Sequence, residues 1–131
     1  MSQKVFISYV FEDKFYSGQL KDWYRQGMLG DYEPVTETDD VRQDGHGAIM
    51  GHLRPLLRSA DAGIVLVGRD SHNRRWVDRE VAYLRSNQKP VILVRIPNTT
   101  GAAPPEIRNL PEVRVSPQDV KRALDAALNR R

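Results

Sequence analysis

Two short runs of the chain are apolar at almost every position, and they restrict its fold more than any other feature. Residues 62–68 read Ala-Gly-Ile-Val-Leu-Val-Gly, and residues 91–96 read Val-Ile-Leu-Val-Arg-Ile. A strand without polar alternation buries both of its faces, which is typical of the central strands of a parallel sheet covered by helices. The two runs therefore predict an α/β fold.

Segments with helical spacing of apolar residues alternate with the strand signals along the whole chain. Strands are expected at 5–9, 32–36, 62–68, 91–96 and 113–115. Helical spacing is found within 16–27, 49–57, 77–84 and 117–128. Pro55 is expected to kink or split the second of these helices, whereas Ser116-Pro117 is typical of a helix start. The proline-rich run 97–111 is expected to be mostly loop, with a short helical turn near 106–109.

This order of elements predicts a flavodoxin-like, doubly wound, five-stranded parallel sheet with strand order 2-1-3-4-5. We expect a single domain over residues 1–131, since no repeat or linker divides the chain. In such a sheet ligands bind beyond the carboxyl ends of the strands, where the strand order reverses. That point lies between the first and third strands, so segments 8–13 and 68–73 are expected to border the site.

Composition narrows the classes of partner. The chain has 20 Lys+Arg against 17 Asp+Glu, a net charge of +3, with no basic block longer than two residues. This pattern favours neither nucleic acid nor a membrane surface as a partner. The absence of cysteine excludes a disulfide scaffold and a thiolate zinc site, and the three histidines lack metal-ligand spacing. No apolar run is long enough to span a bilayer, and we expect a cytoplasmic protein that needs no metal.

The segment 73–80, Asn-Arg-Arg-Trp-Val-Asp-Arg-Glu, opens the helix that follows the third strand. Trp76 and Glu80 are four residues apart and share a helix face, predicted to lie toward the mouth of the crevice. The alternative is that Glu80 is a solvated helix carboxylate paired with a neighbouring arginine. Five arginines fall on this helix and its approach, which indicates a local anion site: Arg69, Arg74, Arg75, Arg79 and Arg85.

Residues 4–9 read Lys-Val-Phe-Ile-Ser-Tyr, and together with the segments above they resemble the TIR-domain family, more specifically the bacterial TIR-like domains of Thoeris antiphage defence. Residues 4–9 are similar to the first-strand box of TIR domains. The Val-Leu-Val-Gly strand end at 65–68 and the segment 73–80 are similar to their third strand and following helix. That helix carries Trp-x-x-x-Glu in enzymatically active members, and the fourth strand of the bacterial group ends in Arg/His-Ile, as at Arg95-Ile96.

The resemblance implies an enzyme that cleaves the nicotinamide N-glycosidic bond of NAD+ or cyclises its ADP-ribose, with Glu80 as the catalytic carboxylate. NAD+ is then a substrate, and no cofactor is expected. A single carboxylate is chemically sufficient, because nicotinamide is bound as a cationic pyridinium and leaves as a neutral base. The resemblance also implies self-association into a homo-oligomer and a downstream effector protein activated by the nucleotide product.

Further residues are predicted to bind substrate. Phe6 or Tyr9 is expected to line the nicotinamide pocket, with a core position as the alternative for Phe6. Ser8 is expected to contact a ribose or phosphate, with a plain strand-end hydroxyl as the alternative. The remaining candidates surround the helix start and suit a pyrophosphate or line the crevice: Arg69, Asp70, Ser71, Arg74, Arg75 and Trp76. Asp39, Asp40 and Asp44 fall in the loop that gates the pocket in TIR domains.

Two other functions of this fold require sequence patterns that the chain lacks. A phospho-receiver domain needs acids at the first strand end and a lysine after the fifth strand, and a flavodoxin needs a hydroxyl-rich phosphate loop; both patterns are absent. Two alternatives stay open. One is a non-catalytic TIR-like module that assembles or senses a nucleotide. The other is an enzyme similar to nucleoside deoxyribosyltransferases, which also use a carboxylate on a nucleoside.

Overall fold

A five-stranded parallel sheet forms the centre of the computed structural model, which describes residues 3–36, 55–69 and 75–128. The strands lie in the order β2-β1-β3-β4-β5, and every neighbouring pair is parallel. Their bounds are β1 (Gln3–Ser8), β2 (Tyr32–Val35), β3 (Ala62–Val67), β4 (Val91–Arg95) and β5 (Glu112–Arg114). The order confirms the predicted flavodoxin-like arrangement.

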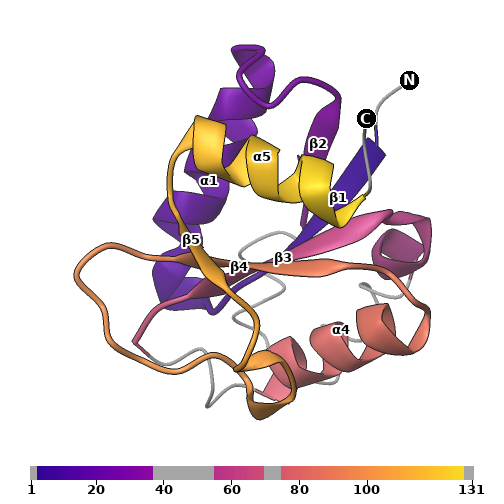
Figure 1. The fold of residues 1–131 in the computed structure, drawn as a ribbon, viewed down its shortest axis with the longest axis vertical. Helices are drawn as coiled ribbons and strands as arrows, with labels where there is room; N and C mark the ends of the chain where they lie inside the picture. Colours follow the sequence, from indigo (N-terminus) through magenta and orange to yellow (C-terminus); the bar gives the residue numbers. More distant parts are fainter. Residues whose placement is uncertain (1–2, 37–54, 70–74, 129–131) are drawn as a thin grey trace.

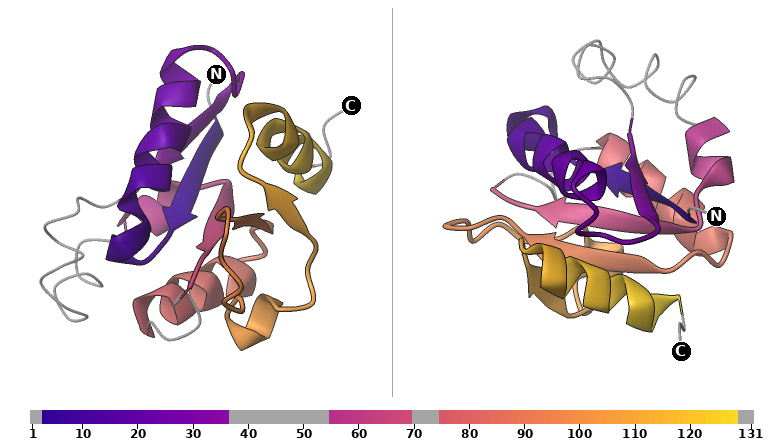
Figure 2. Two further views of the ribbon diagram at one scale, coloured as in Figure 1. Left: turned by 90° about the vertical axis from the view of Figure 1, so that its left-hand side faces the viewer. Right: turned by 90° about the horizontal axis from the view of Figure 1, so that it is seen from above.

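Helices cover both faces of the sheet, as Figure 1 shows. Helices α1 (Lys14–Arg25) and α5 (Pro117–Ala127) lie side by side on one face. Helix α4 (Arg75–Ser86) lies on the other face together with the helical residues 55–59 and the 3-10 turn η3 (Pro105–Ile107). The two rotated views in Figure 2 show the same layering of helix, sheet and helix. This arrangement explains why β3 is buried at all six positions.

Two hydrophobic cores result, one on each face of the sheet. The core under α4 includes Phe6 of β1 and Val65 of β3, packed on Val77, Val81 and Leu84 of α4. The core under α1 and α5 contains the alternate residues of the same strands, packed on helix side chains. Its strand members include Val5, Ile7, Ile64 and Leu66, and its helix members include Leu20, Val120 and Leu124. Side-chain alternation along β1 therefore decides which core each residue joins.

The crossover from β4 to β5 carries no α-helix among the residues described. Instead, η3 provides a single turn, one residue earlier than predicted, and β5 begins at Glu112 rather than at residue 113. Prolines concentrated in this run remove backbone donors and limit helix length. Pro55 opens the described helical stretch 55–59. The expected helix residues 49–54 and the acidic loop 38–47 lie outside the described residues.

Helix α5 is fixed at its start by a side-chain cap. Ser116 has extended backbone geometry, and its Oγ accepts a hydrogen bond from the backbone N–H of Asp119 at 3.1 Å. Pro117 occupies the first helical position, where its missing N–H costs nothing. The carboxylate of Asp119 hydrogen-bonds with Ser116 and faces Arg114, and both contacts lower the pKa of Asp119. The predicted helix start is thus confirmed.

We expect the substitution Ser116→Ala to lower the free energy of unfolding by about 1 kcal/mol, since it leaves a first-turn N–H without its cap. Urea unfolding followed by circular dichroism measures the change. The control is Gln118→Ala, an exposed position of the same helix turn. Equal midpoints for the two variants would show that the cap does not hold α5 in place.

Candidate functional site

A buried hydrogen bond joins the end of β1 to helix α4. The Oγ of Ser8 donates to Oε1 of Glu80 across 2.6 Å, and both residues are 0% exposed. Ser8 is the last residue of β1 and pairs in register with Val65 of β3. The bond therefore lies near the carboxyl ends of β1 and β3, where the strand order reverses. The sequence predicted both residues for the site, and the structure brings them together.

The interpretation of Glu80 as a solvated carboxylate is wrong, because its side chain is fully buried. Val77, Val81 and Leu84 are also fully buried, so the four residues form one inward stripe of α4 at helical spacing. The sequence-based prediction was instead that Glu80 shares a face with Trp76 toward the mouth of the crevice. The spacing itself (i, i+3, i+4, i+7) would have placed Glu80 on the buried face. Burying a carboxyl group costs free energy unless it is hydrogen-bonded, and Ser8 supplies one such bond.

The two aromatic candidates, Phe6 on β1 and Tyr9 directly after it, lie on opposite faces of the sheet. Phe6 shares its face with Ser8 and belongs to the fully buried core under α4. Tyr9 belongs to the core under α1 and α5 and is 1% exposed. Phe6 is thus two residues from Ser8 on the same side, whereas Tyr9 is separated from Glu80 by the sheet.

A small crevice lies beyond the carboxyl ends of β1, β3 and β4. We call it the switch-point crevice; it has a volume of about 250 Å³ and is lined by Val10, Glu12, Asp13, Arg69 and Thr99. Glu12 and Asp13 belong to the 3-10 turn η1 (Phe11–Asp13), and Val10 directly precedes it. Of these residues, the sequence predicts only Arg69 to bind a ligand. The expected border segment 8–13 contains three others, and Thr99 was missed.

Close backbone packing sets the shape of this crevice. A Cβ atom on Gly68 would lie 2.7 Å from Oδ2 of Asp13, so the absence of a side chain lets the carboxylate lie against the end of β3. A Cβ on Gly101 would lie 2.1 Å from the carbonyl oxygen of Gly68 and 2.3 Å from that of Arg69. Residues 97–101, which we call the post-β4 loop, therefore rest directly on the chain that leaves β3.

Arg95, the last residue of β4, holds the post-β4 loop in place. Its Nη1 donates to the carbonyl oxygen of Gly101 at 2.7 Å. Its Nε and Nη2 bind the two carboxylate oxygens of Glu112 on β5 at 2.9 and 2.7 Å. Because one carboxylate binds both Nε and Nη2, this forked pairing fixes the guanidinium group. The Oγ1 of Thr99 donates to the carbonyl oxygen of Ile96 at 2.7 Å, which links the loop to the residue that follows β4.

Several predicted site residues are not placed by the structure. Asp70, Ser71 and Arg74 lie outside the described residues. Arg75 and Trp76 form the first turn of α4, and their side chains also lie outside the description. Their predicted contacts with substrate stay predictions.

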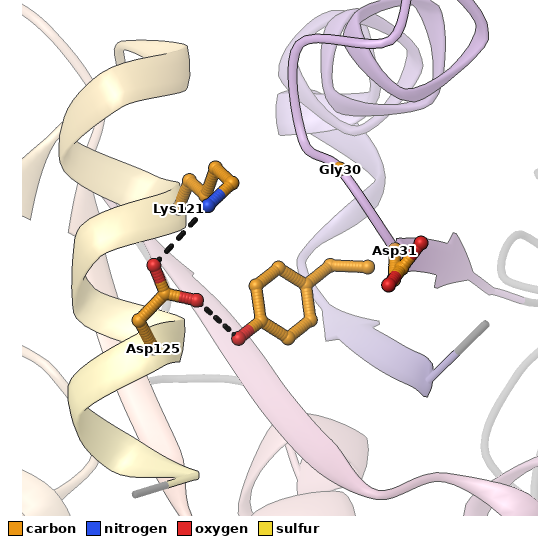
Figure 3. Close-up of a pocket in the computed structure, with 5 residues that line it drawn as sticks. Gly30, Asp31, Lys121 and Asp125 are labelled. Atoms are coloured by element: carbon orange, nitrogen blue, oxygen red, sulfur yellow. Dashed lines mark hydrogen bonds and ion pairs between the residues drawn. The ribbon is translucent and has the colours of Figure 1, made fainter. Parts of the chain in front are cut away.

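A second polar cavity lies at the other end of the sheet, between α5 and the chain that enters β2. It has a volume of about 320 Å³ and is lined by Gly30, Asp31, Tyr32, Lys121 and Asp125. Asp125 accepts hydrogen bonds from the Tyr32 hydroxyl at 2.5 Å and from Nζ of Lys121 at 3.2 Å (Figure 3). These bonds connect α5 to β2, so the cavity belongs to the packing of the helix layer. It lies at the amino end of β2, away from Ser8.

Two further features bear on the kinds of ligand. Within residues 3–36, 55–69 and 75–128, no group of three or more His, Cys, Asp or Glu side chains is arranged to hold a metal ion. None of the helices in this part of the chain combines the length and apolar character needed to cross a bilayer.

Comparison with known proteins gives one family. The family model described as "Thoeris protein ThsB, TIR-like domain" matches residues 6–101, about three quarters of the chain. The match includes residues 6–8 of β1 and the whole of β3, α4 and β4, and with them Ser8, Glu80 and the switch-point crevice. No curated protein matches the chain.

The close packing at Gly101 predicts that a side chain there lowers stability, and Gly18 is a control position where the same substitution should raise it. We expect Gly101→Ala to lower the free energy of unfolding by about 1–3 kcal/mol, because backbone atoms cannot move aside as a flexible side chain would. Gly18 is exposed within α1 and a Cβ there would contact nothing within 4 Å. We expect Gly18→Ala to raise stability by up to about 1 kcal/mol through helix propensity. Denaturant unfolding measures the change in the free energy of unfolding of both variants. An unchanged stability of the Gly101→Ala variant would contradict the close packing.

The Ser8–Glu80 bond is tested by a double-mutant cycle. We expect Ser8→Ala alone to cost about 1–3 kcal/mol, since it removes a donor from a buried carboxyl group. Combined with Glu80→Met, its additional cost should fall by about 0.5–3 kcal/mol, the range for residues in direct contact. Combining Ser8→Ala with Glu106→Met, at an exposed carboxyl, should give additive losses. Additive losses in the Glu80 cycle would show that the bond contributes nothing to stability.

Proposed function

The chain belongs to the family of TIR-like domains of the Thoeris protein ThsB, and from this membership we propose that it acts in antiphage defence as an enzyme on NAD+. Its reaction cleaves the N-glycosidic bond between nicotinamide and ribose. Glu80 is the catalytic carboxylate, and Ser8 positions it.

One observation carries the proposal: Glu80 is a fully buried carboxyl group held by the Ser8 hydroxyl beside the point where the strand order reverses. Ligands of parallel α/β sheets bind at this end of the strands. A carboxylate surrounded by apolar side chains interacts strongly with a positive charge, because water does not screen it. Fixing one oxygen by Ser8 also removes the need to reorient the group during the reaction.

The chemistry requires one carboxylate and no second acid. The bond between the ribose C1′ and the pyridinium nitrogen breaks, and its electron pair neutralises the ring nitrogen, so nicotinamide leaves uncharged. The ribose becomes an oxocarbenium-like cation that Glu80 stabilises electrostatically. Water then adds to C1′ and loses a proton, giving ADP-ribose; attack by a nucleophile of the adenosine end gives a cyclic product instead.

The burial of Glu80 also supports a second candidate function. A carboxyl group with 0% exposure that bonds to Ser8 serves equally as an internal link between β1 and α4. In that case the chain is a non-catalytic TIR-like module that assembles or senses a nucleotide, and the switch-point crevice is its recognition surface. Both candidates place ligand at the same end of the sheet, and they differ in whether nicotinamide is released.

Partners follow from the same proposal. NAD+ is the substrate, copies of the chain associate with one another, and the nucleotide product activates an effector protein. Assays at high protein concentration therefore test the enzyme under conditions that favour self-association.

We expect the purified protein to release nicotinamide from NAD+, measured by chromatography. Glu80→Gln should reduce the rate at least about 100-fold, as for loss of a group that stabilises transition-state charge. Ser8→Ala should give a smaller loss, since it leaves the carboxylate present but less well positioned.

The matched control is Glu106→Gln, the same chemical change at an exposed carboxyl group, which should leave the rate unchanged. Circular dichroism shows whether Glu80→Gln still folds. Absence of release by the unaltered protein at high concentration, with crowding agents present, would contradict the enzyme and support the binding module. Release of a base from a deoxynucleoside, but not from NAD+, would instead support a deoxyribosyltransferase.

A further inference from the structure

We propose that the switch-point crevice is a subsite for a ribose together with the phosphate attached to its C5 oxygen, so that it holds the ribosyl phosphate part of the dinucleotide. The assignment to NAD+ rests on the proposed function, whereas the chemistry of the crevice is argued from its own residues. These are Val10, Glu12, Asp13, Arg69 and Thr99.

The size of the crevice suits a fragment of a dinucleotide rather than the whole molecule. Its volume is about 250 Å³. Pockets that enclose drug-sized ligands have volumes of about 300–1,000 Å³, so this crevice is just below their range. A sugar carrying one phosphate suits such a space, and the rest of a larger ligand would extend along the edge of the sheet.

The charges of the residues that line the crevice indicate the chemical class of its ligand. Glu12 and Asp13 supply carboxylate oxygens, which accept hydrogen bonds. Vicinal hydroxyl groups of a ribose are donors of the matching kind, and acidic residues bind ribose hydroxyls in other parallel α/β folds. Arg69 is exposed at the rim and supplies a guanidinium group for a phosphate.

Two acids beside one arginine also argue against a simple anion site. Inorganic pyrophosphate would gain the contact with Arg69 but would meet the two carboxylates without any hydroxyl donor. A ribosyl phosphate satisfies both kinds of side chain at once. The crevice should therefore prefer a sugar phosphate to a free phosphate anion, which separates it from a non-specific basic patch.

Two of the lining residues, Asp13 and Thr99, are held in place before a ligand arrives. The carboxylate of Asp13 lies against Gly68, where a Cβ atom would come within 2.7 Å of it. Thr99 lies on the post-β4 loop, which Arg95 fixes through Gly101 and Glu112. Preorganisation of this kind lowers the entropic cost of binding. Glu12 and Arg69 are the exposed residues of the lining.

The test is an NMR titration of the ¹⁵N-labelled protein with ribose 5-phosphate, 2-deoxyribose 5-phosphate and pyrophosphate. Ribose 5-phosphate should bind with a Kd on the order of 1 mM, as expected for so small a ligand, and should shift the amide signals of residues 10–13, 68–69 and 99. Loss of the 2-hydroxyl should weaken binding about fivefold, the effect of one hydrogen bond. Pyrophosphate should bind more weakly than ribose 5-phosphate.

Variants assign each contact. Arg69→Ala should weaken the binding of ribose 5-phosphate at least about tenfold, which is the effect of losing a charged hydrogen bond. The control is Arg58→Ala, at another exposed arginine. Asp13→Asn and Gly68→Ala should each reduce the preference for ribose over 2-deoxyribose, because one removes the charge and the other displaces the carboxylate. Glu106→Gln is the control for the acids.

Three results would overturn the subsite: shifts confined to other parts of the protein, equal binding of pyrophosphate, or equal affinity of the Arg69→Ala and Arg58→Ala variants. The outcome is separable from that of the enzymatic proposal. Binding at the crevice without nicotinamide release keeps the subsite and removes the enzyme. Release of nicotinamide with a KM unaffected by Arg69→Ala and Asp13→Asn keeps the enzyme and removes the subsite.

Discussion

The hydrogen bond between Ser8 and Glu80 constrains how the central strands and α4 fit together. A carboxyl group inside an apolar core is tolerated only when it is hydrogen-bonded, and the Ser8 hydroxyl lies 2.6 Å from Oε1 of Glu80. A one-residue slip of β1 would turn Ser8 to the opposite face of the sheet and leave the carboxyl group without this donor. A rotation of α4 about its axis would have the same result. The bond thus requires both the register of β1 and the orientation of α4.

The switch-point crevice depends on a different set of contacts that runs across the sheet toward its edge. Arg95 at the end of β4 joins Glu112 of β5 to the carbonyl oxygen of Gly101, and Gly101 rests on the backbone that follows β3. The three-residue edge strand β5 thereby supports a wall of the crevice two strands away. This arrangement gives a structural reason for an arginine at the end of an otherwise apolar strand. Its partly buried guanidinium group donates to the carbonyl oxygens of Thr99 and Gly101 in the post-β4 loop.

The sequence predicted those parts of the fold that depend on repeated, local patterns. The strand β3 was predictable because a strand buried on both faces is apolar at every position. The start of α5 was predictable because Ser116-Pro117 is a typical helix cap. The burial of Glu80 was readable from its spacing with Val77 and Val81, yet its charge favoured an exposed position. The crevice was less accessible to prediction. Thr99 reaches it only because Gly101 permits two backbone segments to touch, and such an approach has no local pattern in the sequence.

The position of Glu80 connects stability with function. An ionisable group buried in a core costs stability, and a leucine at the same point of the inward stripe of α4 would pack without that cost. A chain that keeps glutamate there therefore gains something other than packing from it. For the reaction proposed here the gain is a carboxylate held in a medium of low dielectric constant, where it stabilises a developing cation far better than a solvated one. The leaving group is neutral on departure, so the site needs no second acid exposed to water. A single buried carboxylate is consequently sufficient for this chemistry, and Ser8 gives it the fixed orientation on which electrostatic stabilisation depends.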